Sequence, residues 1–239
     1  MVQDGYPVVL RIGGASFVVV GGGRAAAGKI GPLLGAGARV TVISPEVDDA
    51  VAALAEDGKL TLIRRTYGGA NDLRGAVLAF AATDRDDVNE AVCRDAASLG
   101  IPVCDTGRPE RGTFLLPAVM RRGKLTVAVS TSGASPALAR KIRDELQEAY
   151  GPEYGEALDF LAEVRRLIRE KVPDAAERSA LLKELAERDV VGLSREGRLE
   201  FVRSRLLADL ASEDAVPISR WRRMLDFSGG RPSTGEMET

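Results

Sequence analysis

The stretch FVVVGGGRAAAGK at residues 17–29 constrains the fold of this chain more than any other part of its sequence. An apolar run leads directly into three glycines, and the alanines that follow favour a helix. A buried strand, a tight turn and a helix in this order open a nucleotide-binding βαβ unit. The chain is therefore predicted to begin with an α/β domain.

Short apolar stretches alternate with helical patterns as far as about residue 131. Their apolar residues are continuous rather than alternating, which is typical of a parallel sheet covered on both faces. The predicted fold class is therefore α/β, with a Rossmann-like parallel sheet. The strands are expected at 17–20, 39–44, 60–64, 76–83, 101–105 and 124–131, and the helices at about 24–34, 48–56 and 86–99.

The pattern changes to amphipathic helices after residue 131. Ser135 and Pro136 are predicted to be the N-cap and first residue of a helix. A break at 151–155 separates this helix from an α-helical C-terminal region, which must pack on itself, on the first domain or on a second copy. Further helices are expected at about 158–168, 174–187, 195–211 and 217–225, and the tail 227–239 is expected to be disordered.

Composition excludes several classes of function. The chain has no histidine, which rules out histidine-based catalytic triads and HExxH zinc sites, and no metal site is predicted. A net charge of −2 gives no basic surface for nucleic acid, and no apolar run approaches the roughly 20 residues that span a bilayer. No signal peptide is visible. We therefore expect a cytoplasmic protein without nucleic-acid or membrane partners, in which Cys93 and Cys104 are buried and unpaired.

Gly21, Gly23 and Ala26 form the dinucleotide-binding pattern G-x-G-x-x-A. The first glycine permits a tight turn, the second lets a pyrophosphate approach the backbone, and the small third residue lets the helix pack on the strand. The N–H groups at the start of the helix bind the phosphates. A dinucleotide cofactor is therefore predicted.

Ser44, Pro45 and Glu46 follow the second strand, at the place where an NAD-binding domain usually has an acid next to the ribose. Ser44 offers one hydroxyl, and Glu46 lies two residues further on. No arginine directly follows this strand to bind the 2′-phosphate of NADP. These residues favour NAD only slightly.

Three motifs together resemble the precorrin-2 dehydrogenase family. They are the glycine turn with Lys29, AATD at 81–84 with Asn89, and STSGASP at 130–136. The similarity covers about residues 6–150. It implies NAD-dependent oxidation of precorrin-2 to sirohydrochlorin on the route to sirohaem and related tetrapyrroles, by a homodimer.

The resemblance also implies a division of the chain and a set of cofactor contacts. The Rossmann domain is expected to be followed by a dimerisation segment and by the α-helical C-terminal region, with divisions at 1–114, 115–150, 151–226 and 227–239. Members of the family need no acid after the second strand, so Ser44 does not count against NAD. The predicted cofactor-binding residues are Gly21, Gly23, Arg24, Ala25, Ser44, Pro45, Glu46, Thr83 and Asp84.

One position departs from the family. Its members usually carry an aspartate after the fifth strand, which is the favoured catalytic group, and the alignment back from Phe114 and Pro117 puts Gly107 there. Asp105 lies two residues earlier, on the same face of a strand and about 6–7 Å away. Asp105 is therefore the predicted catalytic residue, and the alternative is that it caps the turn at the end of the strand.

Precorrin-2 carries many carboxylates, which arginine side chains can bind in pairs of hydrogen bonds. Basic residues gather at 121–124 and 140–143, although a solvated basic face is the alternative for each of them. Thr131 stands where some relatives have a serine at the substrate site. The predicted substrate-binding residues are Ser130, Thr131, Ser132, Arg121 and Arg140.

Three functions remain open at this point. The favoured function is the dehydrogenase alone. A dehydrogenase that also inserts iron or cobalt into sirohydrochlorin would need a group to receive the pyrrole protons, and the lack of histidine makes such a site harder to build. The departure at Gly107 keeps open a third function, an NAD(H)-sensing module without catalysis.

Overall fold

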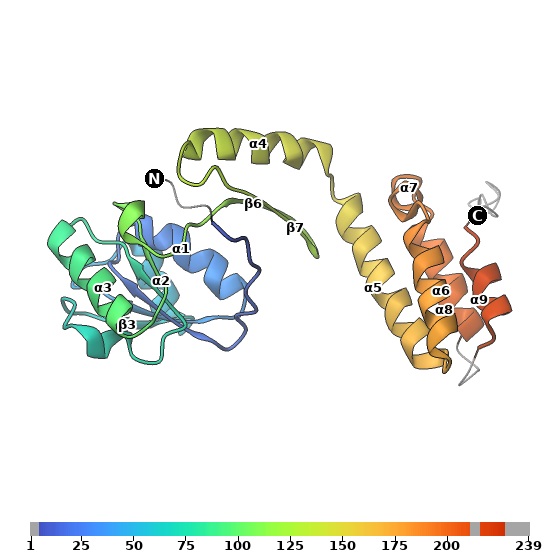
Figure 1. Cartoon of the computed structure of the whole chain (residues 1–239), viewed down its shortest axis with the longest axis horizontal. Helices are drawn as coiled ribbons and strands as arrows, with labels where there is room; N and C mark the ends of the chain where they lie inside the picture. The colour runs from blue at the N-terminus through green and yellow to red at the C-terminus, as the bar shows by residue number, and fades with distance from the viewer. Residues whose placement is uncertain (1–4, 211–215, 228–239) are drawn as a thin grey trace, which may run out of the picture. The chain divides into compact units, whose positions relative to one another are not determined.

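The computed structural model describes residues 5–210 and 216–227, and it divides the chain into two compact units. The first unit comprises Met1–Pro117 and Ser130–Pro136, and the second comprises Ala118–Val129 and Ala137–Thr239. Both units contain buried apolar clusters of their own. Figure 1 shows the helices and strands of the chain with their labels.

The first unit is built on a five-stranded parallel sheet with the order β3-β2-β1-β4-β5. The five strands expected within it are all present, although β2, β3, β4 and β5 are shorter than predicted. They are β1 (Ser16–Val20), β2 (Arg39–Ile43), β3 (Thr61–Ile63), β4 (Leu78–Ala81) and β5 (Val103–Asp105). The predicted Rossmann-like α/β class is therefore confirmed.

Helices cover both faces of this sheet, which explains why its strands are largely apolar. Helices α1 (Arg24–Gly35) and α2 (Asp49–Glu56) pack on one face, where they form one apolar cluster with the strands. Helix α3 (Asp86–Ser98) and the 3₁₀ helix η1 (Ala70–Leu73) pack on the other. A second 3₁₀ helix, η2 (Pro109–Arg111), follows β5.

The strand order reverses between β1 and β4. Strand β1 pairs with β2 on one side and with β4 on the other, so that Val20 lies next to both Ile43 and Ala81. Ligands of doubly wound sheets bind at such a reversal, outside the carboxyl ends of the strands. The residues that follow β1, β2, β4 and β5 all meet at this edge.

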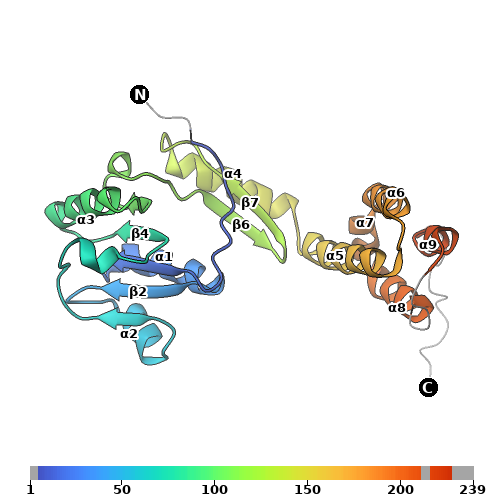
Figure 2. The same ribbon diagram turned by 60° about the horizontal axis from the view of Figure 1, so that its bottom comes forward.

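The second unit begins with an antiparallel hairpin of β6 (Ala118–Arg122) and β7 (Leu125–Val129), which lie side by side in Figure 2. The strand predicted at 124–131 corresponds to β7, but it pairs only with β6 and does not extend the parallel sheet. Strand β6 was not predicted, because charged residues follow its short apolar part and give no clear alternation.

The turn of this hairpin packs against the helices of the same unit, α4 (Pro136–Ala149) and α5 (Glu153–Lys171). Arg122 donates hydrogen bonds from Nε to the carbonyl of Tyr150 at 3.2 Å and from Nη2 to that of Gln147 at 3.2 Å. A Cβ on Gly155 would lie 3.1 Å from the carbonyl carbon of Arg122. The close approach of the turn to α5 therefore depends on glycine.

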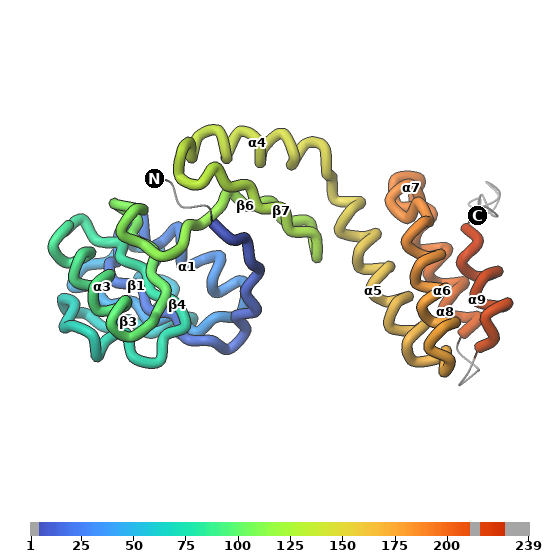
Figure 3. The backbone as a smooth tube through the Cα atoms, viewed as in Figure 1, coloured from blue at the N-terminus to red at the C-terminus, as the bar shows by residue number. Residues whose placement is uncertain are grey.

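Helices α5 to α9 enclose the core of the second unit, and Figure 3 follows their path. Beyond α5 the helices are α6 (Ala175–Ala186), α7 (Val190–Arg195), α8 (Leu199–Leu210) and α9 (Ile218–Met224). The single helix predicted at 195–211 is wrong at its start, because Gly197 has a φ of +68° and ends α7. Trp221 is completely buried in this core.

The tail predicted to be disordered lies outside the described residues from residue 228 onward. Its first residue, Phe227, is buried, and its ring centroid lies 6.0 Å from that of Phe160. None of the helices in the described part of the chain is long and apolar enough to cross a membrane.

Candidate functional site

The glycine turn after β1 fits tightly between the ends of the neighbouring strands. Gly21 has a φ of +112°, and a Cβ there would lie 2.3 Å from the carbonyl oxygen of Ala82. A Cβ on Gly22 would lie 2.4 Å from Cγ1 of Val47. Both positions therefore require glycine. The G-x-G-x-x-A pattern did not predict this requirement at Gly22.

Gly23 differs from its two neighbours because a Cβ there would meet no atom within 4 Å. It is the N-cap of α1, it provides no side-chain cap, and the first turn of the helix contains no acid. Arg24 and Ala25 are exposed, whereas Ala26 is completely buried against the sheet. The N–H groups at this end of α1 are thus open to an anion, which fits the pyrophosphate of a dinucleotide.

The segment after β2 lies against the glycine turn. The Asp48 N–H donates to the carbonyl oxygen of Gly22 at 2.8 Å. Ser44 is buried, and its hydroxyl donates to the carbonyl oxygen of Glu46 at 2.5 Å, so this side chain shapes the turn. Pro45 and Glu46 are exposed. The structure thus brings the predicted residues after β1 and β2 together.

Thr83, which follows β4, is fixed by Asn89 from the first turns of α3. The Thr83 N–H and hydroxyl donate to Oδ1 of Asn89 at 3.1 and 2.7 Å, and Nδ2 of Asn89 donates back to the Thr83 carbonyl at 3.0 Å. Asn89 is buried, whereas Asp84 is exposed. Because Gly21 touches Ala82, the Thr83 loop belongs to the same edge as the glycine turn.

Asp105 ends β5, and its side chain has no exposed surface. Its Oδ1 accepts the N–H groups of Gly107 and Arg108, each at 2.9 Å, and its Oδ2 lies 2.8 Å from Nη2 of Arg111. A Cβ on Gly107 would lie 3.5 Å from Oδ1 of Asp105 and 3.9 Å from Nδ2 of Asn89. These contacts are those of a carboxylate that holds a turn, which was the alternative to a catalytic role.

The two cysteines are buried and unpaired. Burial, and next the charge of Asp105, raise the pKa of the Cys93 thiol to about 11, and its Sγ lies 3.9 Å from Oδ2 of Asp105. Burial likewise raises the pKa of Cys104. Both thiols therefore remain protonated at neutral pH.

Cys93 should resist alkylation until the pH approaches 11. A thiol with a pKa of about 11 has roughly 100-fold less thiolate at pH 8 than one with a pKa of 9, and the thiolate is the reactive form. Labelling by iodoacetamide, measured by mass spectrometry between pH 7 and pH 10, should therefore be slow and should accelerate as the pH rises. Labelling at pH 8 as fast as that of a free cysteine peptide would contradict this.

The predicted substrate residues are divided between the two units. Ser130, Thr131 and Ser132 belong to the first unit, where Oγ1 of Thr131 accepts the Ser135 N–H at 3.1 Å and Oγ of Ser130 accepts the Ser132 N–H at 3.1 Å. Ser132 has a φ of +51°, which is uncommon outside glycine and marks a constrained loop. Arg121 and Arg140 are exposed residues of the second unit.

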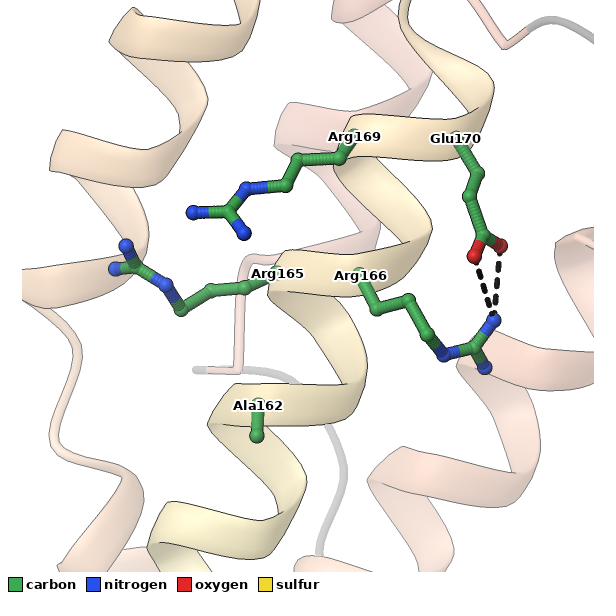
Figure 4. A pocket seen from close by; sticks show the side chains of 5 residues that line it. All are labelled: Ala162, Arg165, Arg166, Arg169 and Glu170. Atoms are coloured by element: carbon green, nitrogen blue, oxygen red, sulfur yellow. Dashed lines mark hydrogen bonds and ion pairs between the residues drawn. The ribbon is translucent and has the colours of Figure 1, made fainter. Parts of the chain in front are cut away.

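Other arginines of the second unit were not singled out by the sequence. A hollow of about 400 Å³ on α5 is lined by Ala162, Arg165, Arg166, Arg169 and Glu170 (Figure 4). Arg166 donates from Nη1 to both carboxylate oxygens of Glu170, at 3.0 and 2.8 Å. Arginine at helical spacing on an amphipathic helix gave no signal that would separate this hollow from an ordinary solvated face.

Comparison with known proteins agrees with this site. Residues 8–118 match a family model described as "Putative NAD(P)-binding", and residues 122–149 match one described as "Sirohaem biosynthesis protein central". The siroheme synthases of Methylobacillus flagellatus and Gluconacetobacter diazotrophicus are 37% and 39% identical to the chain, over 74% and 72% of its length. The matched regions are 38% and 37% of those relatives, so the chain spans about two fifths of their length.

A solved structure matches this chain over nearly its own full length. It is described as SirC, precorrin-2 dehydrogenase, and it is similar to this chain with a TM-score of 0.69 and 32% sequence identity. The match covers 83% of this chain and 98% of the other. The chain therefore belongs to the precorrin-2 dehydrogenase family, a family of nicotinamide-dependent oxidoreductases.

Proposed function

We propose that this protein catalyses the NAD-dependent dehydrogenation of precorrin-2 to sirohydrochlorin in sirohaem biosynthesis. The observation that carries the proposal is the open N-terminus of α1 at the reversal of the strand order, in a chain similar to SirC over 83% of its length. The substrate loses a hydride to the nicotinamide and a proton to a base or to water. The protein's own task is to orient the substrate against the cofactor.

We propose NAD rather than NADP as the cofactor. Glu46 is exposed directly beside the glycine turn, where a Cβ on Gly22 would lie 2.6 Å from its carbonyl oxygen. A carboxylate in this place accepts hydrogen bonds from ribose hydroxyls and repels a 2′-phosphate. The residue that could favour NADP is Arg64, which is exposed directly after β3 and carries a charge that could bind a 2′-phosphate. The test measures initial rates with NAD and with NADP for the wild type and for Glu46→Gln. The wild type should be faster with NAD, and the two rates should be closer to each other in the variant.

The proposed reaction does not include metal insertion. Metal insertion needs a group that receives the pyrrole protons, and the predicted alignment puts Gly107 at the place of the family's aspartate. The nearest acid, Asp105, is buried and already accepts from two N–H groups and from Arg111. Incubation of sirohydrochlorin with Co²⁺ should therefore give the same rate of metal insertion with and without the protein, and an acceleration would support the bifunctional alternative.

We further propose that two copies of the chain assemble and that residues 130–132, Arg121 and Arg140 bind the substrate's carboxylates. The hairpin of β6 and β7 supports the dimer, because a two-stranded sheet is marginal by itself and Val119 on β6 is 37% exposed. Light scattering should give the mass of two chains. A mass of one chain at micromolar concentration would contradict the dimer while leaving the reaction to be tested separately.

A further inference from the structure

Four residues of the first unit form a closed ring of ion pairs and hydrogen bonds, and one of them, Arg108, takes part through both its side chain and its backbone N–H. Oδ1 of Asp86, the first residue of α3, lies 2.5 Å from Nη2 of Arg111 and 3.2 Å from Nε of Arg108. The same Nη2 lies 2.8 Å from Oδ2 of Asp105. Oδ1 of Asp105 accepts the N–H of Arg108 at 2.9 Å, which closes the ring. The ring thus ties the turn 105–111 to the start of α3.

The two acids of the ring lie in different surroundings. The Asp105 side chain has no exposed surface and that of Arg111 is 19% exposed, so these two form the inner pair. Asp86 and Arg108 are 52% and 58% exposed and form the outer part. The pKa of Arg111 is raised chiefly by its hydrogen bond to Asp86. Asp86 can therefore be changed without leaving a buried charge unpaired.

The start of α3 holds a second loop of the same edge. Asn89 lies one turn along from Asp86 and fixes Thr83 through its side-chain amide. A Cβ on Gly107 would lie 3.9 Å from Nδ2 of that same Asn89. The turn 105–111 and the Thr83 loop are thus both positioned by the first residues of α3, one through Asp86 and the other through Asn89.

We propose that Asp86 is a positioning residue for the dehydrogenation, which holds the backbone of Gly107 in place beside the Thr83 loop. The proposal rests on the proposed function. It assigns Asp86 no contact with substrate or cofactor, because its carboxylate acts through Arg108 and Arg111. Displacing a reacting partner by about 1 Å can cost up to about 100-fold in rate, so a surface ion pair can matter in this place.

The test compares Asp86→Asn with Asp87→Asn. Both variants remove one charge from the first turn of α3, so their effects on the helix dipole are matched. Within the residues that the structure describes, the ion-pair partner of Asp87 is Arg85 at 2.6 Å, and both side chains of that pair are more than 60% exposed. Hydrogen exchange of the Gly107 and Arg108 amides, the affinity for NADH, and kcat with precorrin-2 are measured for each variant.

Asp86→Asn should speed exchange at the two amides and lower kcat by about fivefold, while the affinity for NADH stays within about twofold of wild type. Asp87→Asn should leave all three unchanged. Equal behaviour of the two variants would overturn the proposal, and so would faster exchange with an unchanged kcat. If the wild type binds NADH but does not turn over precorrin-2, the proposed function has failed. In that case the exchange rates still test Asp86, and equal rates in all three proteins would overturn its role in holding the turn.

Discussion

Gly21→Ala should destabilise the first unit and abolish dinucleotide binding. A Cβ at this position would lie 2.3 Å from the backbone oxygen of Ala82, and the φ of +112° is unfavourable for any residue with a side chain. The clash is with backbone, so no rotation of a side chain can relieve it. We expect a loss of about 3 kcal/mol or more in the free energy of unfolding, measured by urea denaturation.

Gly23→Ala should separate cofactor binding from stability. A Cβ there meets no protein atom within 4 Å, and the backbone is extended with a φ of −80°. The free energy of unfolding should therefore change by no more than about 1 kcal/mol. The added methyl group occupies the space through which the pyrophosphate approaches, so the affinity for NADH should fall at least about tenfold.

Gly28→Ala is the matched control for both variants. Gly28 is an exposed glycine inside α1, and a Cβ there also meets nothing within 4 Å. Alanine should stabilise the helix by about 0.5–1 kcal/mol and leave the affinity for NADH unchanged. If Gly23→Ala bound NADH as tightly as Gly28→Ala, the pyrophosphate would not lie at the N-terminus of α1.

Asp105→Ala should cost about 3–5 kcal/mol of the free energy of unfolding, because it leaves the Gly107 and Arg108 N–H groups and the inner guanidinium of Arg111 without their buried acceptor. Asp57→Ala, which removes an exposed carboxylate paired with Lys59, should cost no more than about 0.5 kcal/mol. A similar cost for the two variants would contradict the role of Asp105 in the turn.

Asp105→Asn separates the two roles considered for this residue. The amide oxygen still accepts the Gly107 and Arg108 N–H groups, but an amide cannot take up a proton. If Asp105 holds the turn, this variant should retain a large part of the turnover measured per folded molecule. A loss of nearly all turnover, with folding and NADH affinity intact, would show that Asp105 is the catalytic residue after all.

The nucleotide-binding part of the fold was predictable because its signals are local. Apolar runs give β1 and β2, the glycines after β1 give the turn, and the alanines give α1. The constraint at Gly22 was hidden, because it depends on Val47 being brought against the turn by the parallel pairing of β1 with β2. The predicted helix at 195–211 missed the end of α7, although Gly197 after a helical pattern is a typical signal for a helix end.

The surroundings of Asp105 were not predictable from the sequence. Arg111 comes from the 3₁₀ helix after β5, and Asp86 comes from the start of α3, the helix that precedes that strand in the chain. No periodic pattern connects these positions, and each of them alone resembles an ordinary surface charge. The alternation rule predicted that Asp105 shares a face with position 107, but only the folded turn shows that its side chain is buried and which groups occupy its oxygens.

Anaerobic incubation of the wild-type protein with precorrin-2 and NAD tests the central claim most directly. NADH and the tetrapyrrole are followed together by their absorbance, with NADP in a parallel reaction. We expect NADH and sirohydrochlorin to form in equal amounts, faster with NAD than with NADP. NADH binding without either product would contradict the proposal and would support a protein that senses NAD(H) through the same site.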